Sequence, residues 1–321
     1  MKKLPLLLAC GIALSMQAKK QLGHEDFDSW CSPRIHALSN DGNWAAFSVV
    51  PQEGDAQLYV RNVRNGKEIV IPRGSQPSFL AGSEWLVAKI VPEFTATRKA
   101  KIDKKKDFDM PQDSLAIVNL RTMKVEKIPC VISYRVAKDG GTWLAYESCD
   151  TAYVSPKALK DKKAGHPLII RDLASATGSL KVIPWVKEYC FAKPGNRLAL
   201  YTAPWKKDTL ASSARMMLLN LPDTAEMTLL ADMKHYGQPV FDETGSRLAF
   251  TATLDSAESG TRRYDTYLVD LTASTPVAEQ QYILRAVNEG HTPNIMPPRI
   301  TDESKRDSII ADMRRRVTAM A

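Results

Sequence analysis

Residues 193–201 read Lys-Pro-Gly-Asn-Arg-Leu-Ala-Leu-Tyr, and residues 243–250 read Glu-Thr-Gly-Ser-Arg-Leu-Ala-Phe. Each stretch is a turn containing glycine, followed by a short apolar strand. Glycine supplies the positive φ that a tight turn between antiparallel strands needs. The pattern also occurs earlier in the chain, at residues 39–47, 81–88 and 138–146, with its glycines at 42, 82 and 141. A pattern that recurs at intervals of 40–60 residues predicts a protein built from repeated units.

A second pattern alternates with the first. It is an apolar strand that ends in Asn or Asp plus one apolar residue, and its copies are Leu58–Val63, Leu115–Leu120, Leu168–Leu173, Met216–Leu221 and Thr266–Leu271. The first three copies are followed by another strand, which ends in Ile-Pro at Pro72, Pro129 and Pro184. Each unit therefore holds about four short strands.

Four short antiparallel strands in roughly 40–60 residues are typical of one blade of a β-propeller. We therefore expect an all-β fold with four-stranded antiparallel blades over residues 19–278. The count of units gives about four to five blades, so we expect the propeller to be incomplete. The alternative is a β-sandwich. The recurrence of similar strand sequences disfavours it, because the strands of a sandwich do not repeat one sequence pattern.

The composition is that of a soluble globular protein, with 44% hydrophobic and 25% charged residues and a net charge of +8. The five cysteines form no C-x-x-C motif, which disfavours zinc ribbons and thioredoxin-type sites.

The N-terminus has the parts of a secretory signal. Two lysines precede the apolar run 4–16, and small or polar residues follow it. We predict a signal peptide at 1–18 and export to the periplasm, the cell envelope or the medium. A lipid anchor at Cys10 is an alternative, because Leu7-Leu-Ala-Cys10 resembles a lipoprotein cleavage box. The apolar run is too short to span a membrane as a helix. At the other end, residues 279–321 predict a loop and a polar, partly helical tail.

The stretch His24–Val63 resembles the start of secreted bacterial serine peptidases of the prolyl oligopeptidase family. So does the basic segment Arg98–Lys106, which leads through Met110-Pro-Gln-Asp-Ser-Leu115. The resemblance covers about residues 20–275. It implies an N-terminal propeller that lies over the mouth of an α/β-hydrolase domain and admits short peptides. The implied partners are peptides and a hydrolase domain or partner chain.

The catalytic part of that family is not found in this sequence. No glycine is followed two residues later by serine, so the G-x-S-x-G nucleophile motif is absent. The five histidines follow no metal-site spacing, and no glycine-rich phosphate loop occurs. We therefore predict no catalytic, cofactor-binding or metal-binding residues, and no peptidase activity for the chain alone. The alternative function is a stand-alone periplasmic propeller that binds or scaffolds partners.

Two basic stretches, 98–106 and 157–163, have the charge that could attract a nucleic acid. Neither has interleaved aromatic residues for base stacking, so we expect solvated loops and no nucleic-acid partner. Trp44, Trp85 and Trp143 follow the repeat turn at near-equivalent places, which predicts packing between blades.

Cys130 and Cys149 flank the predicted hairpin at 139–140 at similar distances. They should therefore be cross-strand neighbours, close enough for a disulfide. We predict a disulfide between them, with a buried thiol pair as the alternative. Cys31 and Cys190 give no basis for pairing.

Overall fold

The structure, a computed structural model, describes residues 23, 30–175, 180–207, 213–256, 262–273 and 276–281. In this part of the chain nearly all regular structure is antiparallel β-sheet, accompanied by two short α-helices and one 3-10 turn. No helix among these residues is long and apolar enough to cross a membrane. The predicted all-β class is confirmed.

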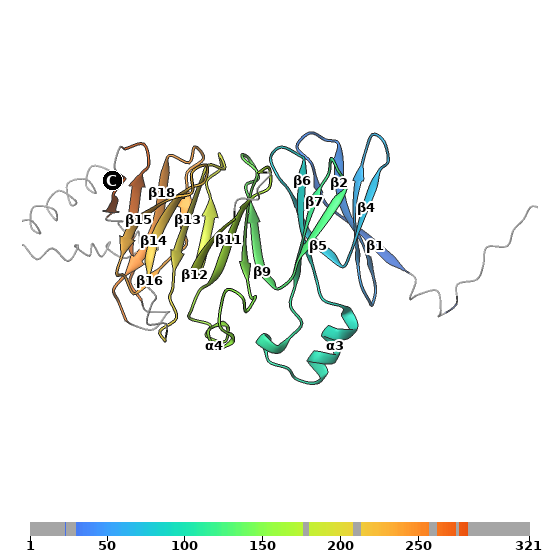
Figure 1. The fold of residues 1–321 in the computed structure, drawn as a ribbon, viewed down its shortest axis with the longest axis horizontal. Helices are drawn as coiled ribbons and strands as arrows, with labels where there is room; N and C mark the ends of the chain where they lie inside the picture. Colours follow the sequence, from blue (N-terminus) through green and yellow to red (C-terminus); the bar gives the residue numbers. More distant parts are fainter. Residues whose placement is uncertain are drawn as a thin grey trace, which may run out of the picture.

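The strands form five consecutive blades (Figure 1). Blade 1 consists of β1 (Cys31–Leu38), β2 (Trp44–Pro51), β3 (Gln57–Asn62) and β4 (Glu68–Pro72). Blade 2 consists of β5 (Gly74–Phe79), β6 (Trp85–Ile90), β7 (Ser114–Asn119) and β8 (Lys124–Ile128). Between β6 and β7 lie α3 (Phe94–Ile102) and the 3-10 turn η1 (Asp107–Asp109).

Blades 3 and 4 share one long strand. Blade 3 holds β9 (Val131–Val136), β10 (Trp143–Ser148), β11 (His166–Asp172) and the first half of β12 (Leu180–Phe191), with α4 (Pro156–Leu159) between β10 and β11. Blade 4 holds the second half of β12, β13 (Arg197–Thr202), β14 (Arg215–Asn220) and β15 (Ala225–Ala231). The register shows the division, because residues up to Val186 pair with β11 and those from Val186 onward pair with β13.

Blade 5 begins with two short strands, β16 (His235–Tyr236) and β17 (Val240–Phe241), which both pair with β18. It continues through β18 (Arg247–Thr253), β19 (Asp265–Asp270) and β20 (Ala278–Gln281). Five blades agree with the predicted four to five.

The turn between the first two strands of each blade places one residue in the left-handed region. Four of these residues are the predicted glycines Gly42, Gly141, Gly195 and Gly245, with φ between 67° and 73°. In blade 2 the prediction was wrong by one position. Ser83 adopts φ 56° there, and its N–H donates to the Leu80 carbonyl as the glycines do in three other blades.

The crossover from one blade to the next also requires a left-handed residue. Arg73, Cys130, Trp185 and Asp232 have φ between 55° and 61°. Arg73, Cys130 and Asp232 stand between the last strand of one blade and the first of the next, and Trp185 lies where β12 passes from blade 3 to blade 4. Arg73, Cys130 and Trp185 directly follow the Ile-Pro ends of the repeated strands. Such a residue costs a non-glycine side chain about 1–2 kcal/mol. Its recurrence at these crossovers shows that the reversal of the chain depends on it.

The core lies between neighbouring blades. Alternate residues of each strand point to opposite faces of a blade, so one blade contributes to two interblade clusters. Blades 1 and 2 share one cluster, blades 2 and 3 a second, blades 3 and 4 a third, and blades 4 and 5 a fourth.

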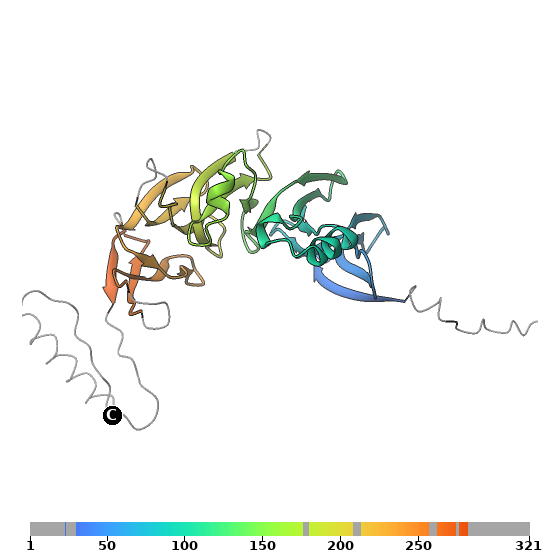
Figure 2. The ribbon, with the colours of Figure 1, turned by 90° about the horizontal axis from the view of Figure 1, so that it is seen from below.

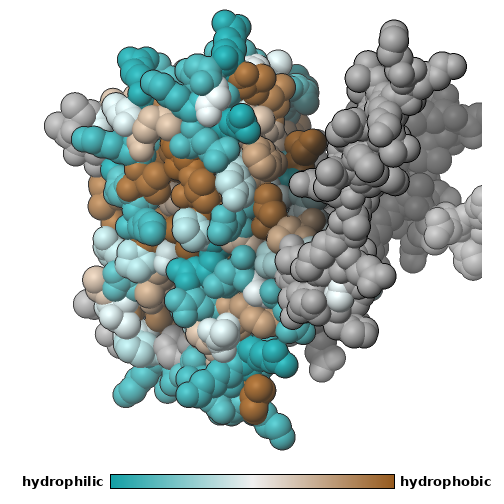
Figure 3. Space-filling model, turned by 90° about the vertical axis from the view of Figure 1, so that its right-hand side faces the viewer, coloured by the Kyte–Doolittle hydropathy of each residue, from teal (hydrophilic) through white to brown (hydrophobic). Residues whose placement is uncertain are grey.

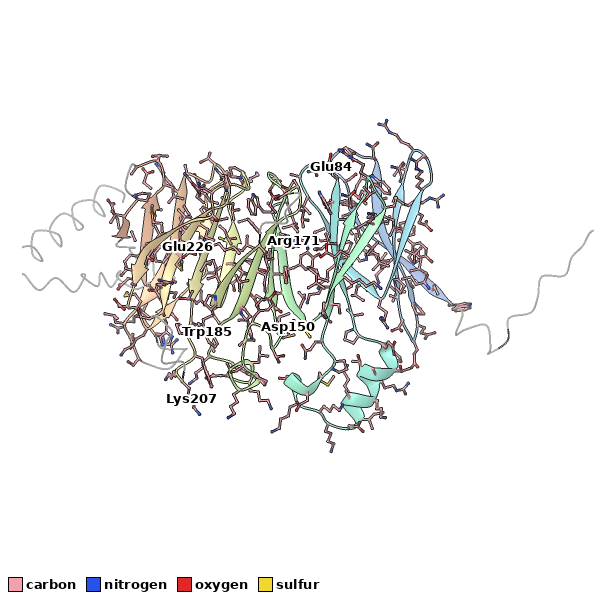
Figure 4. All side chains as sticks on the ribbon, viewed as in Figure 1. Glu84, Asp150, Arg171, Trp185, Lys207 and Glu226 are labelled. Carbon is pink, nitrogen blue, oxygen red and sulfur yellow. The ribbon has the colours of Figure 1, made fainter. Side chains whose placement is uncertain are left out.

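Ion pairs on the outer strands add to this packing. Arg171 of blade 3 makes a bidentate pair with Glu126 of blade 2, at 2.7 and 3.0 Å. Lys181 of blade 3 lies 3.0 Å from Glu226 of blade 4. Arg171 and Glu226 appear at similar heights on the blades in Figure 4.

The five blades lie along an arc (Figure 2). Blades 1 and 5 are at its two ends, and among the described residues no strand of one pairs with a strand of the other. The expected incomplete propeller is confirmed. The predicted signal peptide at 1–18, Cys10 and all of the predicted tail beyond Gln281 lie outside the described residues.

Candidate interaction surface

The outer face of blade 1 carries an apolar row that crosses all four strands. Ile35 pairs with Phe47, Phe47 with Tyr59, and Tyr59 with Val70. The rings of Phe47 and Tyr59 stack with centroids 5.3 Å apart and planes at 7°. Ile35 is 89% exposed and Val70 is 43% exposed. We call these four residues the end face. Figure 3 looks at this end of the molecule and shows hydrophobic residues gathered between polar ones.

The central pair of the end face has an equivalent in every other blade. Phe47 stands five residues after the left-handed turn residue, and Tyr59 three residues before the Asn or Asp of the next strand. The pairs at the same places are Ala88 with Ala116, Tyr146 with Ile169, Leu200 with Met217, and Phe250 with Tyr267. All eight of these residues are at most 8% exposed.

The equivalent pairs are buried because each packs against the preceding blade. Phe250 and Tyr267, for example, stack 5.4 Å apart in the cluster shared by blades 4 and 5. Phe47 and Tyr59 belong to none of the four clusters and are only partly buried. Burying one large apolar side chain stabilises by roughly 1.5–3 kcal/mol. The end face therefore has the composition of a blade interface without a described blade against it.

The other end of the arc has a different composition. In blades 1 to 4, Leu58, Leu115, Leu168 and Met216 occupy the same strand position and are buried toward the next blade. In blade 5 that position is Thr266, which is half-buried. At this one position blade 5 therefore carries a polar side chain where the other four blades carry an apolar one.

A pocket of about 380 Å³ lies where the first strands of blades 2, 3 and 4 approach one another. Ser78, Tyr134, Arg135 and Phe191 are among the residues that line it. The Arg135 guanidinium lies 4.9 Å from the centre of the Tyr189 ring and is hydrogen-bonded to Glu188. Arg135 thus links blades 3 and 4 beside the pocket and already has an anionic partner.

A buried carboxyl lies near this ion pair. Glu147 on β10 is 14% exposed, and its Oε2 lies 3.8 Å from Nδ1 of His166. Burial, followed by the nearby charge of Glu188, raises the pKa of Glu147 to about 7. Burial lowers the pKa of His166, and the charge of Lys187 adds to this effect. The charge of Glu147 therefore changes near neutral pH, beside a histidine whose pKa lies below its ordinary value.

Cys130 and Cys149 are neighbours, as predicted. The Cys149 N–H donates to the Cys130 carbonyl at 2.9 Å, one step beyond the paired residues Val131 and Ser148. Both cysteines are free thiols in the structure. The disulfide itself stays a prediction.

The tryptophans of the repeat pack between blades. Trp44 and Trp143 are 8% and 9% exposed and belong to interblade clusters, and Trp85 packs against a third. This prediction is confirmed. Trp185 is the left-handed crossover residue between blades 3 and 4, and it lies near the lower edge in Figure 4.

The basic stretches are partly helical, which the sequence reading missed. The helix α3 contains Arg98, Lys99 and Lys101, and the short helix α4 contains Lys157. The expectation of simple loops was therefore wrong. In the α3 helix only Ala100 is buried, which explains why no apolar period of 3.6 residues marks it.

Comparisons with known proteins identify no family. No known family matches the chain, and no curated protein matches it. Among solved structures the chain is similar to the β-propeller domain of the Trilobed protease from Pyrococcus furiosus. The identity is 12%, the TM-score 0.42, and the match covers 81% of this chain and 73% of that one.

Two other similar structures are longer than this chain. A prolyl endopeptidase matches at 11% identity with a TM-score of 0.45, over 87% of this chain and 42% of that one. TolB from Acinetobacter baumannii matches at 12% identity with a TM-score of 0.34, over 78% of this chain and 55% of that one. The chain thus spans about half the length of these two proteins.

Proposed function

We propose that this chain is a non-catalytic β-propeller module that works by docking a further polypeptide unit on the end face of blade 1. The observation that carries the proposal is the apolar row Ile35–Phe47–Tyr59–Val70. No described blade covers its central pair, whereas the equivalent pairs of the other four blades are buried. Interfaces are recognised by such clustered apolar and aromatic side chains.

The sequence resemblance of residues 20–275 suggests what the whole assembly does. In the prolyl oligopeptidase family a propeller gates the access of peptides to a hydrolase domain. We infer that this chain is the corresponding part of an exported peptidase of that kind, with the hydrolase chemistry supplied by other polypeptide. The chain itself lacks the G-x-S-x-G motif.

The second candidate is a stand-alone propeller of the cell envelope that binds or scaffolds partners. Thr266 favours it, because terminal repeats carry polar residues on their outer face and blade 5 has threonine where the other four blades have an apolar residue. Under this proposal only the end face of blade 1 has a partner.

Two measurements test the proposal. The purified chain should not hydrolyse fluorogenic peptides, and hydrolysis that a serine-reactive inhibitor abolishes would show that the module is catalytic. Sedimentation velocity should show association that grows with concentration, and Phe47→Lys with Tyr59→Lys should abolish it while leaving the circular dichroism spectrum unchanged. Wild-type protein that stays monomeric at every concentration would favour the stand-alone propeller over a part of a larger peptidase.

A further inference from the structure

The two neighbouring cysteines occupy a pair of positions that the fold repeats. At the crossover from blade 1 to blade 2, the carbonyl of Arg73 accepts a hydrogen bond from the N–H of Val91 at 3.0 Å. At the crossover from blade 3 to blade 4, the carbonyl of Trp185 accepts from the N–H of Ala203 at 2.6 Å. In each case a left-handed crossover residue lies opposite the residue that follows the second strand of the next blade.

Cys130 and Cys149 are this pair at the crossover from blade 2 to blade 3. Cys130 is the left-handed residue, with φ 55°, and Cys149 directly follows β10. Their backbone hydrogen bond is 2.9 Å. The crossover geometry therefore holds the two cysteines opposite each other independently of any bond between their sulfur atoms.

Directly opposed residues of antiparallel strands have Cβ atoms about 4.5–5.5 Å apart. A disulfide needs Cβ atoms about 3.5–4.5 Å apart and Cα atoms about 4.4–6.8 Å apart. The two ranges of Cβ separation meet at about 4.5 Å, so the bond needs at most a small adjustment of the backbone at the crossover. The two thiols also interact, since the pKa of Cys149 is raised to about 12, first by burial and then by Cys130. The other described cysteines lie on different blades, with Cys31 on β1 and Cys190 on β12.

We propose that Cys130 and Cys149 are a reversible redox pair whose disulfide fastens the crossover between blades 2 and 3 to the end of β10. The oxidant is a small-molecule or protein disulfide. The Cys130 sulfur, as thiolate, attacks the oxidant and forms a mixed disulfide, and the Cys149 sulfur then gives up its proton and displaces the oxidant's remaining sulfur. One S–S bond forms in this chain and one breaks in the oxidant, which accepts two electrons and leaves with both protons as two thiols. This proposal does not depend on the proposed function.

The test is thiol mapping of the full chain in buffers of reduced and oxidised glutathione. In the oxidising buffer, mass spectrometry after alkylation should find a peptide that links residues 130 and 149, while Cys31 and Cys190 stay alkylated. Oxidation should raise the thermal midpoint by about 5 °C, because a cross-link of this span restricts the unfolded chain. Cys130→Ser and Cys149→Ser should lose the increase, and Cys31→Ser should keep it.

An engineered pair tests the geometry separately. In a chain with Cys130→Ser and Cys149→Ser, the pair Arg73→Cys with Val91→Cys should form the equivalent bond. The mismatched pair Arg73→Cys with Ala203→Cys should not. The proposal is overturned if Cys130 and Cys149 stay fully alkylated in oxidised glutathione, or if they link to Cys31 or Cys190 instead.

Discussion

The ring of Phe47 stacks on the ring of Tyr59 at a centroid distance of 5.3 Å, on the one face of blade 1 that no described blade covers. Phe250 and Tyr267 make the same stack at the same positions of blade 5, where blade 4 buries them. One cross-strand pair thus occurs in two environments within one chain. This permits direct comparisons in which the same substitution is made in both places.

Replacing Phe250 and Phe47 by alanine should lower the free energy of unfolding by different amounts. Phe250→Ala removes a side chain that is 2% exposed, and it should lower the free energy of unfolding by about 3–5 kcal/mol. Phe47→Ala removes only the stack on Tyr59 and should cost about 1 kcal/mol. Urea unfolding of the two variants measures the difference. Equal costs would show that Phe47 is already buried in the folded monomer.

The turn glycines should differ in their tolerance of alanine. Gly42 and Gly195 both have left-handed φ, 67° and 72°, so alanine costs each about 1–2 kcal/mol. A Cβ at Gly42 meets nothing within 4 Å, whereas one at Gly195 would collide with the backbone carbonyl of Gly140 in the neighbouring turn. Gly195→Ala should therefore cost roughly 1–3 kcal/mol more than Gly42→Ala in the same urea assay. A cost no greater than that of Gly42→Ala would contradict the close approach of the two turns.

Stability should fall as the pH rises from about 4.5 to 7. The pKa of Glu147 is about 7 in the folded protein against an ordinary value of 4.5, so the folded state holds a proton that the unfolded state releases. The stabilisation of the folded state by this proton is fully present below pH 4.5 and is lost above pH 7. Its size is on the order of 3 kcal/mol. His166 acts in the opposite direction below about pH 6.5 and so offsets part of this fall, because its pKa is lowered from 6.5 on folding.

The variant Glu147→Gln isolates this effect from other titrating groups. It keeps the shape of the side chain and cannot release the proton, so its stability should exceed that of the wild type at pH 8 and match it near pH 4.5. Urea unfolding at a series of pH values gives both curves. Parallel curves would mean that Glu147 titrates normally in the folded protein.

The repeat allowed the blades to be predicted from sequence, because the turn residue and the Asn or Asp of the next strand are local requirements of the backbone. Ser83 was missed because a glycine stands beside it, and the sequence does not say which of the two takes the left-handed conformation. The role of Trp185 was missed for a related reason. Ile-Pro directly precedes Arg73, Cys130 and Trp185 and so marks the three crossovers in the sequence. These residues are recognised as crossovers only when the positions of successive sheets are known.

The end face could not be predicted in the same way. Phe47 and Tyr59 are the same residue types at the same repeat positions as Phe250 and Tyr267. The sequence alone therefore predicts the same buried environment for both pairs. The difference arises from the position of the blade in the arc. Alignment of the repeats would have shown that the residues are equivalent, and only the open end of blade 1 shows that one pair lacks a covering blade.

Site-specific photo-crosslinking in the native host tests the central claim most directly. A benzophenone amino acid at position 47 should yield a discrete product of higher mass whose second component mass spectrometry can identify. The same group at Thr251, on the outer side of the last described blade, should yield none. Absence of a product at position 47 under conditions where the chain is folded and abundant would contradict the account that the outer side of blade 1 is a docking surface.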